Sequence, residues 1–166
     1  MSPQGMEEEM HQACLLLGSN IEPERNIPRA VDLLNERLTI LQVSSVWESA
    51  SAECCYPDYL NLAALVATHL PASELKEKVL RPLEEQMGRV RTEDKNAARP
   101  IDLDIILFDG ALLDPTLFEY AFRAVPVAEI FPEYPSAQGE ALKDIARRLA
   151  ETFPVQLRKD ITVTVS

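Results

Sequence analysis

The chain has 166 residues and a formal net charge of −11, from 27 acidic and 16 basic residues. This acidity argues against nonspecific binding to nucleic acid or to anionic membranes, since both require a basic surface. The hydrophobic content of 46% is ordinary for a soluble globular protein, and this length suffices for one well-buried core. We therefore expect a disordered lead-in over residues 1–12 and a single domain over residues 13–166.

Cysteine usage and the lack of targeting features predict a cytoplasmic protein. The three cysteines, Cys14, Cys54 and Cys55, are odd in number and include an adjacent pair, which fits neither a disulfide framework nor a spaced zinc site. Residues 1–11 contain no apolar run of the kind found in a signal peptide, and no apolar stretch approaches the length that spans a membrane. We expect no membrane partner and a monomer or small homo-oligomer.

The first part of the chain alternates between strand and helix patterns. A short apolar run over residues 13–17 ends in Gly18-Ser19-Asn20 and predicts a strand followed by a turn. Apolar residues then recur at helical spacing over residues 24–38. Residues 40–47 alternate as a strand, and residues 49–57 are typical of a loop.

A second set of elements follows. Residues 58–68 are predicted to form a strand, although their long apolar run is also compatible with a helix. Ser73 is a suitable N-cap for a helix that extends to Met87, with a kink or a break at Pro82. Residues 101–108 are predicted to form another strand.

The order strand, helix, strand, strand, helix, strand over residues 13–108 is typical of the ferredoxin-like βαββαβ plan, an α+β fold. It predicts a mainly antiparallel sheet covered by helices. After the turn signal Asp109-Gly110, residues 124–132 suggest a single helical turn between prolines. A helical stripe over residues 141–153 and an alternating strand over residues 161–165 would form a C-terminal extension.

Two acidic residues interrupt the strand predicted at 101–108. Successive strand side chains point to opposite faces, so Asp102 and Asp104 share one face. Neighbouring carboxylates repel each other and lose hydration unless a cation neutralises them, and Mg²⁺ is the natural candidate. Arg99 and the segment Gly88-Arg89-Val90-Arg91 would supply cations for phosphate. The pattern supports a phosphoryl-transfer hypothesis, whose alternative is an exposed strand face with two solvated acids.

Four short motifs together resemble those of the 6-hydroxymethyl-7,8-dihydropterin pyrophosphokinase family of folate biosynthesis. They occur in the family's order and approximate spacing: Leu17-Gly18-Ser19-Asn20, Asp58-Tyr59-Leu60-Asn61, Gly88-Arg89-Val90-Arg91 and Arg99-Pro100-Ile101-Asp102-Leu103-Asp104-Ile105. The resemblance covers residues 13–108 well and extends more weakly to residues 126–130. It implies a ferredoxin-like, ATP-dependent enzyme that transfers pyrophosphate from ATP to the hydroxymethyl oxygen of the pterin and releases AMP.

On the phosphate side, the resemblance implies roles for two acids and three arginines. Asp102 and Asp104 would hold two Mg²⁺ ions that bridge the ATP triphosphate. Arg89 and Arg99 would stabilise the phosphate charge that develops during transfer. Arg91 would lie on a loop that closes over the site. All three arginines would bind ATP.

On the pterin side, the resemblance implies a slot between aromatic side chains. Asn61 corresponds to an amide whose paired donor and acceptor read the edge of the heterocycle. Tyr59 and Phe122 correspond to the two aromatics that sandwich the ring. For Tyr59 the alternative is a strand aromatic that faces the core. Backbone groups near Ser49 and Ala50 would complete the pocket.

At other positions the resemblance leaves alternatives open. Glu84 corresponds to an acid that hydrogen-bonds the nucleotide, but a solvated acid on the helix is an equally good interpretation. Asn96-Ala97-Ala98 replaces a tryptophan and a proline that are common in the family, so stacking by that loop is lost or altered. The family's Pro-His segment with its following basic residue is missing, and residues 114–122 look shortened across it. Arg123 either replaces the lost cation or, as the simpler interpretation, is a solvated surface residue.

Two other functions stay open beside the leading pyrophosphokinase hypothesis. The missing basic segment favours a paralogue that binds a pterin or a nucleotide with an altered substrate or with little turnover. A non-enzymatic ferredoxin-like module for nucleic acid or regulation is the third. RNA-binding sheets of that kind need exposed aromatics among basic residues, which the charge of −11 opposes. We therefore expect ATP and a pterin as small-molecule partners and no nucleic acid.

Overall fold

The computed structural model describes residues 9–50, 58–88 and 100–165. Their strands form one antiparallel sheet in the order β6-β5-β1-β4-β3-β7, with β2 also paired to β4. The strands are β1 (His11–Ser19), β2 (Thr39–Val43), β3 (Trp47–Ser49), β4 (Tyr59–Thr68), β5 (Asp102–Phe108), β6 (Ala111–Leu112) and β7 (Val155–Leu157). The central order β5-β1-β4-β2 is that of a ferredoxin-like sheet, so the predicted fold class is confirmed.

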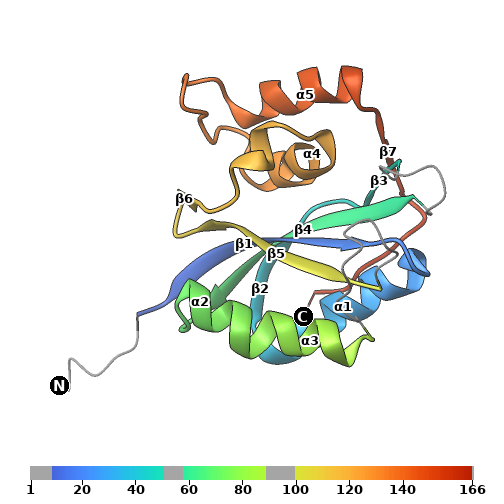
Figure 1. Ribbon diagram of the computed structural model, residues 1–166, viewed down its shortest axis with the longest axis vertical. Helices are drawn as coiled ribbons and strands as arrows, with labels where there is room; N and C mark the ends of the chain where they lie inside the picture. The colour runs from blue at the N-terminus through green and yellow to red at the C-terminus, as the bar shows by residue number, and fades with distance from the viewer. Residues whose placement is uncertain (1–8, 51–57, 89–99, 166) are drawn as a thin grey trace, which may run out of the picture.

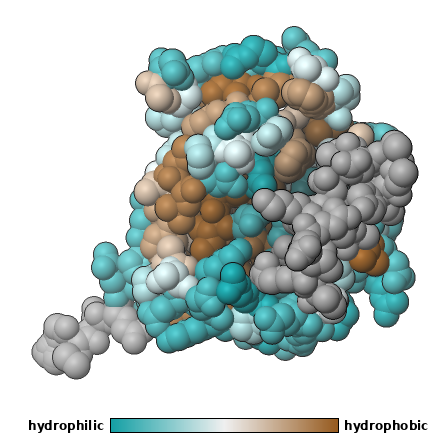
Figure 2. Space-filling view, in the orientation of Figure 1, coloured by the Kyte–Doolittle hydropathy of each residue, from teal (hydrophilic) through white to brown (hydrophobic). Residues whose placement is uncertain are grey.

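Helices cover both faces of the sheet (Figure 1). On one face lie α1 (Pro23–Arg37) and three consecutive segments: α2 (Ala72–Leu75), the π-helix η1 (Lys76–Leu80) and α3 (Arg81–Gln86). On the other face lie α4 (Ala121–Ile130) and α5 (Leu142–Thr152), preceded by the 3-10 turn η2 (Pro115–Phe118). Figure 2 shows apolar residues gathered between the two helical layers and polar residues on their outer sides. No helix of the described segments is long and apolar enough to cross a membrane.

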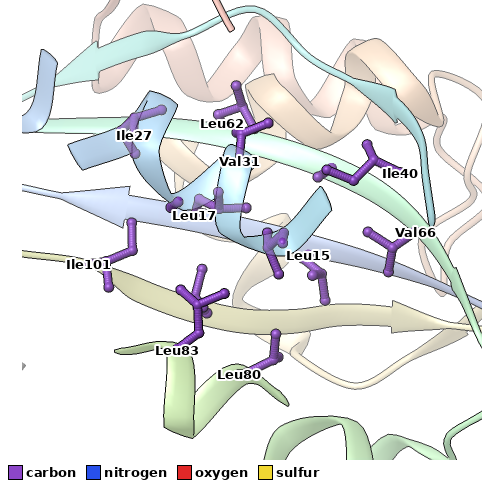
Figure 3. Close-up of a cluster of buried hydrophobic side chains, with 14 of the residues drawn as sticks. Leu15, Leu17, Ile27, Val31, Ile40, Leu62, Val66, Leu80, Leu83 and Ile101 are labelled. Carbon is purple, nitrogen blue, oxygen red and sulfur yellow. The ribbon is translucent and has the colours of Figure 1, made fainter. Parts of the chain in front are cut away.

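The larger core lies between the sheet and the α1 and α2–α3 helices. Figure 3 shows Leu15 and Leu17 of β1 in one cluster with Ile27 and Val31 of α1. Together with Leu34, these α1 residues recur at i, i+4 and i+7, which is the spacing of a helix face that packs on a sheet. All five side chains are 0% exposed, and burying each contributes about 1.5–3 kcal/mol.

A second core holds α4 and α5 against the opposite face. The alternate β1 residues Cys14 and Leu16 pack there with Ala124 and Val127 of α4. Because both faces of β1 are covered, its side chains are apolar on both sides, and this explains the unbroken run at residues 13–17. The helix α4 therefore has a fixed position against β4, β1 and β3.

A carboxylate of α4 also bonds directly to the polypeptide between β2 and β3. Glu129 accepts hydrogen bonds from the backbone nitrogen of Ser45 at 3.1 Å and from its Oγ at 3.0 Å. The indole Nε1 of Trp47 donates to the other oxygen of the same carboxylate. These bonds join α4 to the sheet end that carries β3.

The single strand predicted at residues 40–47 is wrong, because the chain forms β2 and β3 with a break between them. A bulge in the pairing with β4 lies between Ile40 and Gln42. It leaves Leu41 47% exposed while Ile40 is buried, so the predicted alternation of faces fails there. At the break, the backbone nitrogen of Ser44 still donates to the carbonyl of Ala63 at 2.8 Å, but the return bond uses the side chain, since Ser44 Oγ accepts from the backbone nitrogen of Ala63 at 2.8 Å. The strand predicted at residues 58–68 is confirmed as β4.

The helix predicted from Ser73 to Met87 is present, with its irregularity before Pro82, but Ser73 as its N-cap is wrong: the helix begins at Ala72, and Pro71 is the N-cap. A proline lacks an N–H and clashes with the carbonyl one turn earlier, so a regular α-helix cannot continue through it unchanged. Here the π-helical segment Lys76–Leu80 precedes Pro82, and the backbone N–H of Arg81 donates to the carbonyl of Lys76, five residues earlier. The wider turn accommodates the proline without ending the helix.

The two ends of the described chain differ from prediction. β1 begins at His11, so residues 11 and 12 are strand and not lead-in; the imidazole Nδ1 lies 2.6 Å from an Asp109 carboxylate oxygen. At the other end, α5 is confirmed, but residues 161–165 form no strand, and β7 lies earlier. Their alternation has another cause, because Ile161, Val163 and Val165 pack against the larger core. α4, at ten residues, is longer than the single turn predicted at 124–132.

Candidate active site

A pocket of about 620 Å³ opens between the sheet, α4 and the segment that joins α5 to β7. Seven of the residues proposed from the sequence line it together: Ser49, Ala50, Tyr59, Asn61, Asp102, Asp104 and Phe122. They come from β3, β4, β5, α4 and the residue after β3, so segments up to 73 positions apart in the sequence meet at one place. The candidates Arg89, Arg91 and Arg99 lie outside the described residues.

The aspartate pair lies on the pocket side of β5. Asp102 pairs with Gly18 of β1 and Asp104 with Leu16, so both side chains are on the face covered by α4. Leu103 between them is 0% exposed and belongs to the larger core on the opposite face. The alternation predicted from the sequence therefore describes this strand correctly.

Asp104 is mostly buried in a mixed electrostatic environment. Its Oδ1 lies 3.9 Å from Lys76 Nζ, and its Oδ2 lies 3.6 Å from Arg123 Nη1. Burial is the largest effect and raises the pKa of Asp104, and the charge of Asp102 raises it further. Arg123 and Lys76 act in the opposite direction without cancelling this rise. A further cation, in addition to Lys76 and Arg123, is therefore favourable at the Asp104 carboxylate.

Glu84 has a structural contact that neither interpretation from the sequence included. The side chain is 1% exposed, so the interpretation as a solvated acid is wrong. Its Oε2 accepts a hydrogen bond from the backbone nitrogen of Leu103 at 2.8 Å. Lys76 Nζ donates to the carbonyl of the same Leu103 at 3.0 Å. The two side chains from the α2–α3 helices thus satisfy the outer edge of β5 between the two aspartates.

The inner wall of the pocket holds a buried amide. Asn61 is 3% exposed, and its Nδ2 lies 3.4 Å from Ser49 Oγ on the neighbouring strand. Gly18 lies opposite Asn61 in the β1–β4 pairing. A Cβ at Gly18 would lie 2.9 Å from Asn61 Oδ1, so any other residue at this position would force the amide to shift. The amide position therefore depends on a glycine that the sequence presents only as a turn signal.

Aromatic side chains line both sides of the pocket. Phe122 of α4 stacks with Tyr120, with ring centroids 5.5 Å apart and planes inclined by 21°. Tyr59 at the start of β4 is half-buried and lines the pocket, and it belongs to neither core. Phe153 after α5 adds a fourth, 55% exposed ring. Such an arrangement suits a flat heterocycle.

Arg123 is part of the pocket, so its interpretation as a solvated surface residue is wrong. Its side chain is 18% exposed, and its guanidinium carbon lies 5.2 Å from the centre of the Phe122 ring. Its Nη1 lies 3.2 Å from Asp114 Oδ2, in addition to the contact with Asp104. The pattern of residues 114–132 is irregular, and the sequence predicted only one helical turn where α4 has ten residues. For this reason the sequence did not predict that Arg123 lines the pocket.

The wall formed by residues 152–155 was also missed. These residues lie about 50 positions after the aspartates, and no motif in the sequence links them to the site. They reach the pocket because β7 pairs with β3 at the sheet edge. The periodicity of the sequence contains no information on the pairing of β7 with β3, so it could not show that residues 152–155 line the pocket.

The paired aspartates suit Mg²⁺ but do not form a complete protein cage. Within residues 9–50, 58–88 and 100–165, no group of three or more His, Cys, Asp or Glu side chains could hold a metal ion. Mg²⁺ is commonly held by one or two carboxylates together with water and substrate phosphates. Two carboxylates on one pocket wall fit that mode, because the remaining ligands would come from a phosphorylated substrate.

Comparison with known proteins gives consistent results. Residues 14–132 match the family model described as 7,8-dihydro-6-hydroxymethylpterin-pyrophosphokinase (HPPK). A 2-amino-4-hydroxy-6-hydroxymethyldihydropteridine pyrophosphokinase of Pseudomonas aeruginosa is 31% identical over 142 residues, which are 78% of this chain and 86% of the relative. The folic acid synthesis protein FOL1 of Dictyostelium discoideum is 30% identical over 130 residues, 72% of this chain but only 20% of that protein.

Solved structures share the fold. A crystal structure of a Plasmodium falciparum HPPK-DHPS variant with STZ-DHP superposes with a TM-score of 0.70 at 12% identity, covering 93% of this chain and 49% of that chain. The wild-type protein with pterin and p-hydroxybenzoate gives a TM-score of 0.67 at 13% identity, covering 93% and 46%. This chain thus spans about half of the Plasmodium chains and a fifth of the Dictyostelium protein.

Proposed function

The chain belongs to the 7,8-dihydro-6-hydroxymethylpterin-pyrophosphokinase family, and from this premise we propose that it transfers pyrophosphate from ATP to the hydroxymethyl oxygen of 6-hydroxymethyl-7,8-dihydropterin. The bond from the β-phosphorus to the oxygen that joins it to the α-phosphate breaks, a bond from the pterin oxygen to the β-phosphorus forms, the hydroxyl proton is released to water, and AMP leaves with the bridging oxygen. One observation carries the proposal: a single pocket holds the aspartate pair, the buried amide of Asn61 and several aromatic side chains. ATP is the co-substrate.

The pterin would occupy the part of the pocket lined by β3, β4 and α4. Asn61 presents a donor and an acceptor in a buried position, where they discriminate strongly between heterocycle edges. Tyr59 and Phe122 line the same pocket and would contact the faces of the ring. Ser49 and Ala50 lie beside Asn61 and would complete the edge contacts. The pterin hydroxymethyl group would then be directed toward β5.

The triphosphate would lie along the aspartate side of the pocket. Asp102 and Asp104 would hold Mg²⁺, two ions by analogy with the family, and bound Mg²⁺ neutralises phosphate charge and aligns the reacting oxygens. The chain itself contributes the partial burial of Asp104 and the fixed β5 edge, which keep both carboxylates in place before substrate arrives. Arg89 and Arg99 would bind phosphate oxygens, and Arg91 would belong to a closing loop.

Glu84 has a more indirect part in this proposal than a nucleotide contact. Its Oε2 bonds to the backbone nitrogen of Leu103, the residue between the two aspartates. We therefore assign it first to the support of β5. A contact between Glu84 and the nucleotide, inferred from the family resemblance, would have to involve the same buried carboxylate.

The assay follows AMP release from ATP and Mg²⁺ with and without 6-hydroxymethyl-7,8-dihydropterin. We expect pterin-dependent AMP release in the wild type and its loss in Asp102→Ala and Asp104→Ala. Asp32→Ala, at an exposed position on α1, is the matched control and should keep wild-type turnover. Absence of pterin-dependent AMP at every Mg²⁺ concentration would refute the proposed reaction. Wild-type rates in either pocket variant would refute the metal assignment.

A second function is favoured by the arrangement of Arg123. Its contacts with two aspartates are consistent with the hypothesis that Arg123 replaces the cation of the family's missing basic segment, and a site altered in this way could bind ligands with little turnover. Pterin binding in calorimetry without AMP release would identify this case. For the protein as a whole, we propose a cytoplasmic monomer or small homo-oligomer, which size-exclusion chromatography with light scattering would test.

A further inference from the structure

Arg123 forms a bridge between two carboxylates at the edge of the pocket. Its Nη1 lies 3.6 Å from Asp104 Oδ2 and 3.2 Å from Asp114 Oδ2. The guanidinium therefore already occupies one side of Asp104, which the proposed function assigns to a metal ion. A carboxylate oxygen that faces a guanidinium is less available to a second cation, because the two positive charges repel each other.

The guanidinium also has unused hydrogen-bonding capacity. Its Nε and Nη1 are buried, yet neither forms a hydrogen bond with correct geometry to any described residue. Buried donors are nearly always satisfied in folded proteins, so an exception calls for a missing partner. A phosphate group is a suitable partner, because its oxygens accept charge-assisted hydrogen bonds from a guanidinium. Arg123 lines the pocket in which such a group would bind.

The residues around Arg123 hold its guanidinium in place. Asp114 Oδ1 accepts hydrogen bonds from the backbone nitrogen of Thr116 at 3.0 Å and from its hydroxyl, so its Oδ2 is directed at Arg123. The Phe122 ring lies 5.2 Å from the guanidinium carbon. Asp114 would therefore still hold Arg123 if the contact with Asp104 were lost.

We propose that Arg123 is an internal counterion that exchanges partners. Before substrate binds, it neutralises Asp104 and lowers the affinity of the aspartate pair for a divalent cation; when the triphosphate binds, it donates to phosphate oxygens. This inference rests on the proposed function, because it takes the aspartate pair as the metal site. It has a specific consequence: the arginine weakens the binding of metal alone and strengthens the binding of the triphosphate alone.

The test measures the two ligands separately, so that the result does not depend on turnover. Mn²⁺ binding without nucleotide is followed by electron paramagnetic resonance, and binding of α,β-methylene ATP in excess EDTA by calorimetry. An opposite charge beside a carboxylate changes its affinity for a proton about tenfold or more, and we expect an effect of this order for Mn²⁺. Arg123→Met should bind Mn²⁺ about tenfold more tightly and the metal-free analogue about tenfold more weakly.

Two further variants serve as controls. Arg147→Met removes an exposed arginine of α5 that pairs only with Asp144 among described residues, and both affinities should be unchanged. Arg123→Lys keeps the charge but loses the paired donors, so Mn²⁺ affinity should stay near wild type while analogue affinity falls. A merely structural role for Arg123 would move both affinities in the same direction, and circular dichroism verifies folding of each variant.

The outcomes separate this inference from the proposed function. Equal Mn²⁺ affinity in wild type and Arg123→Met would refute the counterion role, and equal analogue affinity would refute the phosphate contact. If neither the wild type nor Arg123→Met binds Mn²⁺ and the wild type also lacks pterin-dependent AMP release, the proposed function fails together with the inference. If the wild type shows pterin-dependent turnover but lacks the opposite-sign effect, only the inference fails.

Discussion

Replacement of Glu84 tests whether the support of β5 is energetically important. The carboxylate is 1% exposed and accepts from the backbone nitrogen of Leu103 at 2.8 Å. Hydrogen bonds to charged groups contribute about 1.5–3 kcal/mol, and a buried donor left unsatisfied costs about 1–3 kcal/mol. Glu84→Ala removes this bond and leaves the backbone N–H of Leu103 unsatisfied. Because the two effects describe the same bond and overlap, the free energy of unfolding should fall by about 2–4 kcal/mol. At about 2–4 °C per kcal/mol for this chain length, the Tm should fall by on the order of 10 °C.

The measurement is thermal unfolding followed by circular dichroism, with the adjacent exposed residue as control. Glu85→Ala removes a similar carboxylate from the surface of α3, and its Tm should change by less than about 2 °C. Glu84→Gln keeps an acceptor oxygen without the charge and should lie between Glu84→Ala and the wild type. A Tm of Glu84→Ala equal to that of Glu85→Ala would refute the structural role. Weaker binding of an ATP analogue with an unchanged Tm would instead favour the nucleotide contact.

Three further predictions concern the pocket and the second core. Gly18→Ala would place a Cβ 2.9 Å from Asn61 Oδ1 and displace the amide. Pterin affinity measured by calorimetry should fall roughly tenfold, the equivalent of about one lost hydrogen bond. Unchanged affinity would exclude Asn61 from the pterin site. Because burial raises the pKa of Asp104, the folded chain binds a proton there more tightly than the unfolded chain, and ionised Asp104 lowers stability above the folded-state pKa. Asp104→Asn should therefore unfold at higher urea concentration at pH 8, and the gain should shrink as the pH falls through the folded-state pKa toward 3.8; equal midpoints at pH 8 would contradict this reasoning. Burial raises the pKa of the Cys14 thiol to about 12. Iodoacetamide at pH 8 should therefore leave Cys14 unmodified in the native protein and modify it in urea, which peptide mass spectrometry would show. Rapid modification of the native protein would mean that β1 opens.

Local chemistry made the central sheet predictable. The alternation at Asp102, Leu103 and Asp104 gave the correct faces, because the side-chain period of a strand does not depend on its partners. The apolar stripe of α1 was equally clear, since one face packs on the sheet and the other faces water. The order of these elements was sufficient to identify the fold class. These are the features for which local pattern and tertiary structure agree.

Features that depend on long-range contacts were not predictable. The bulge after Ile40 and the bonding of Ser44 to Ala63 arise from the partner strand β4, so the alternation of residues 40–47 gave no sign of them. The alternation of residues 161–165 was real but reflects packing against a core without strand pairing. Arg123 lies in the pocket because it belongs to the helix α4, which continues past Pro126. In each case a distant segment decided the local structure.

The hydrogen bond between Trp47 and Glu129 makes the intrinsic tryptophan fluorescence of the protein sensitive to the position of α4. The chain contains a single tryptophan, so its intrinsic indole fluorescence comes from one known position. That indole donates to a carboxylate of α4, the helix that also carries Phe122 and Arg123. Any ligand that shifts α4 relative to β3 would change the polarity around the indole and hence its emission wavelength. The order in which substrates engage this helix can thus be followed in real time, without a label and without a change in sequence.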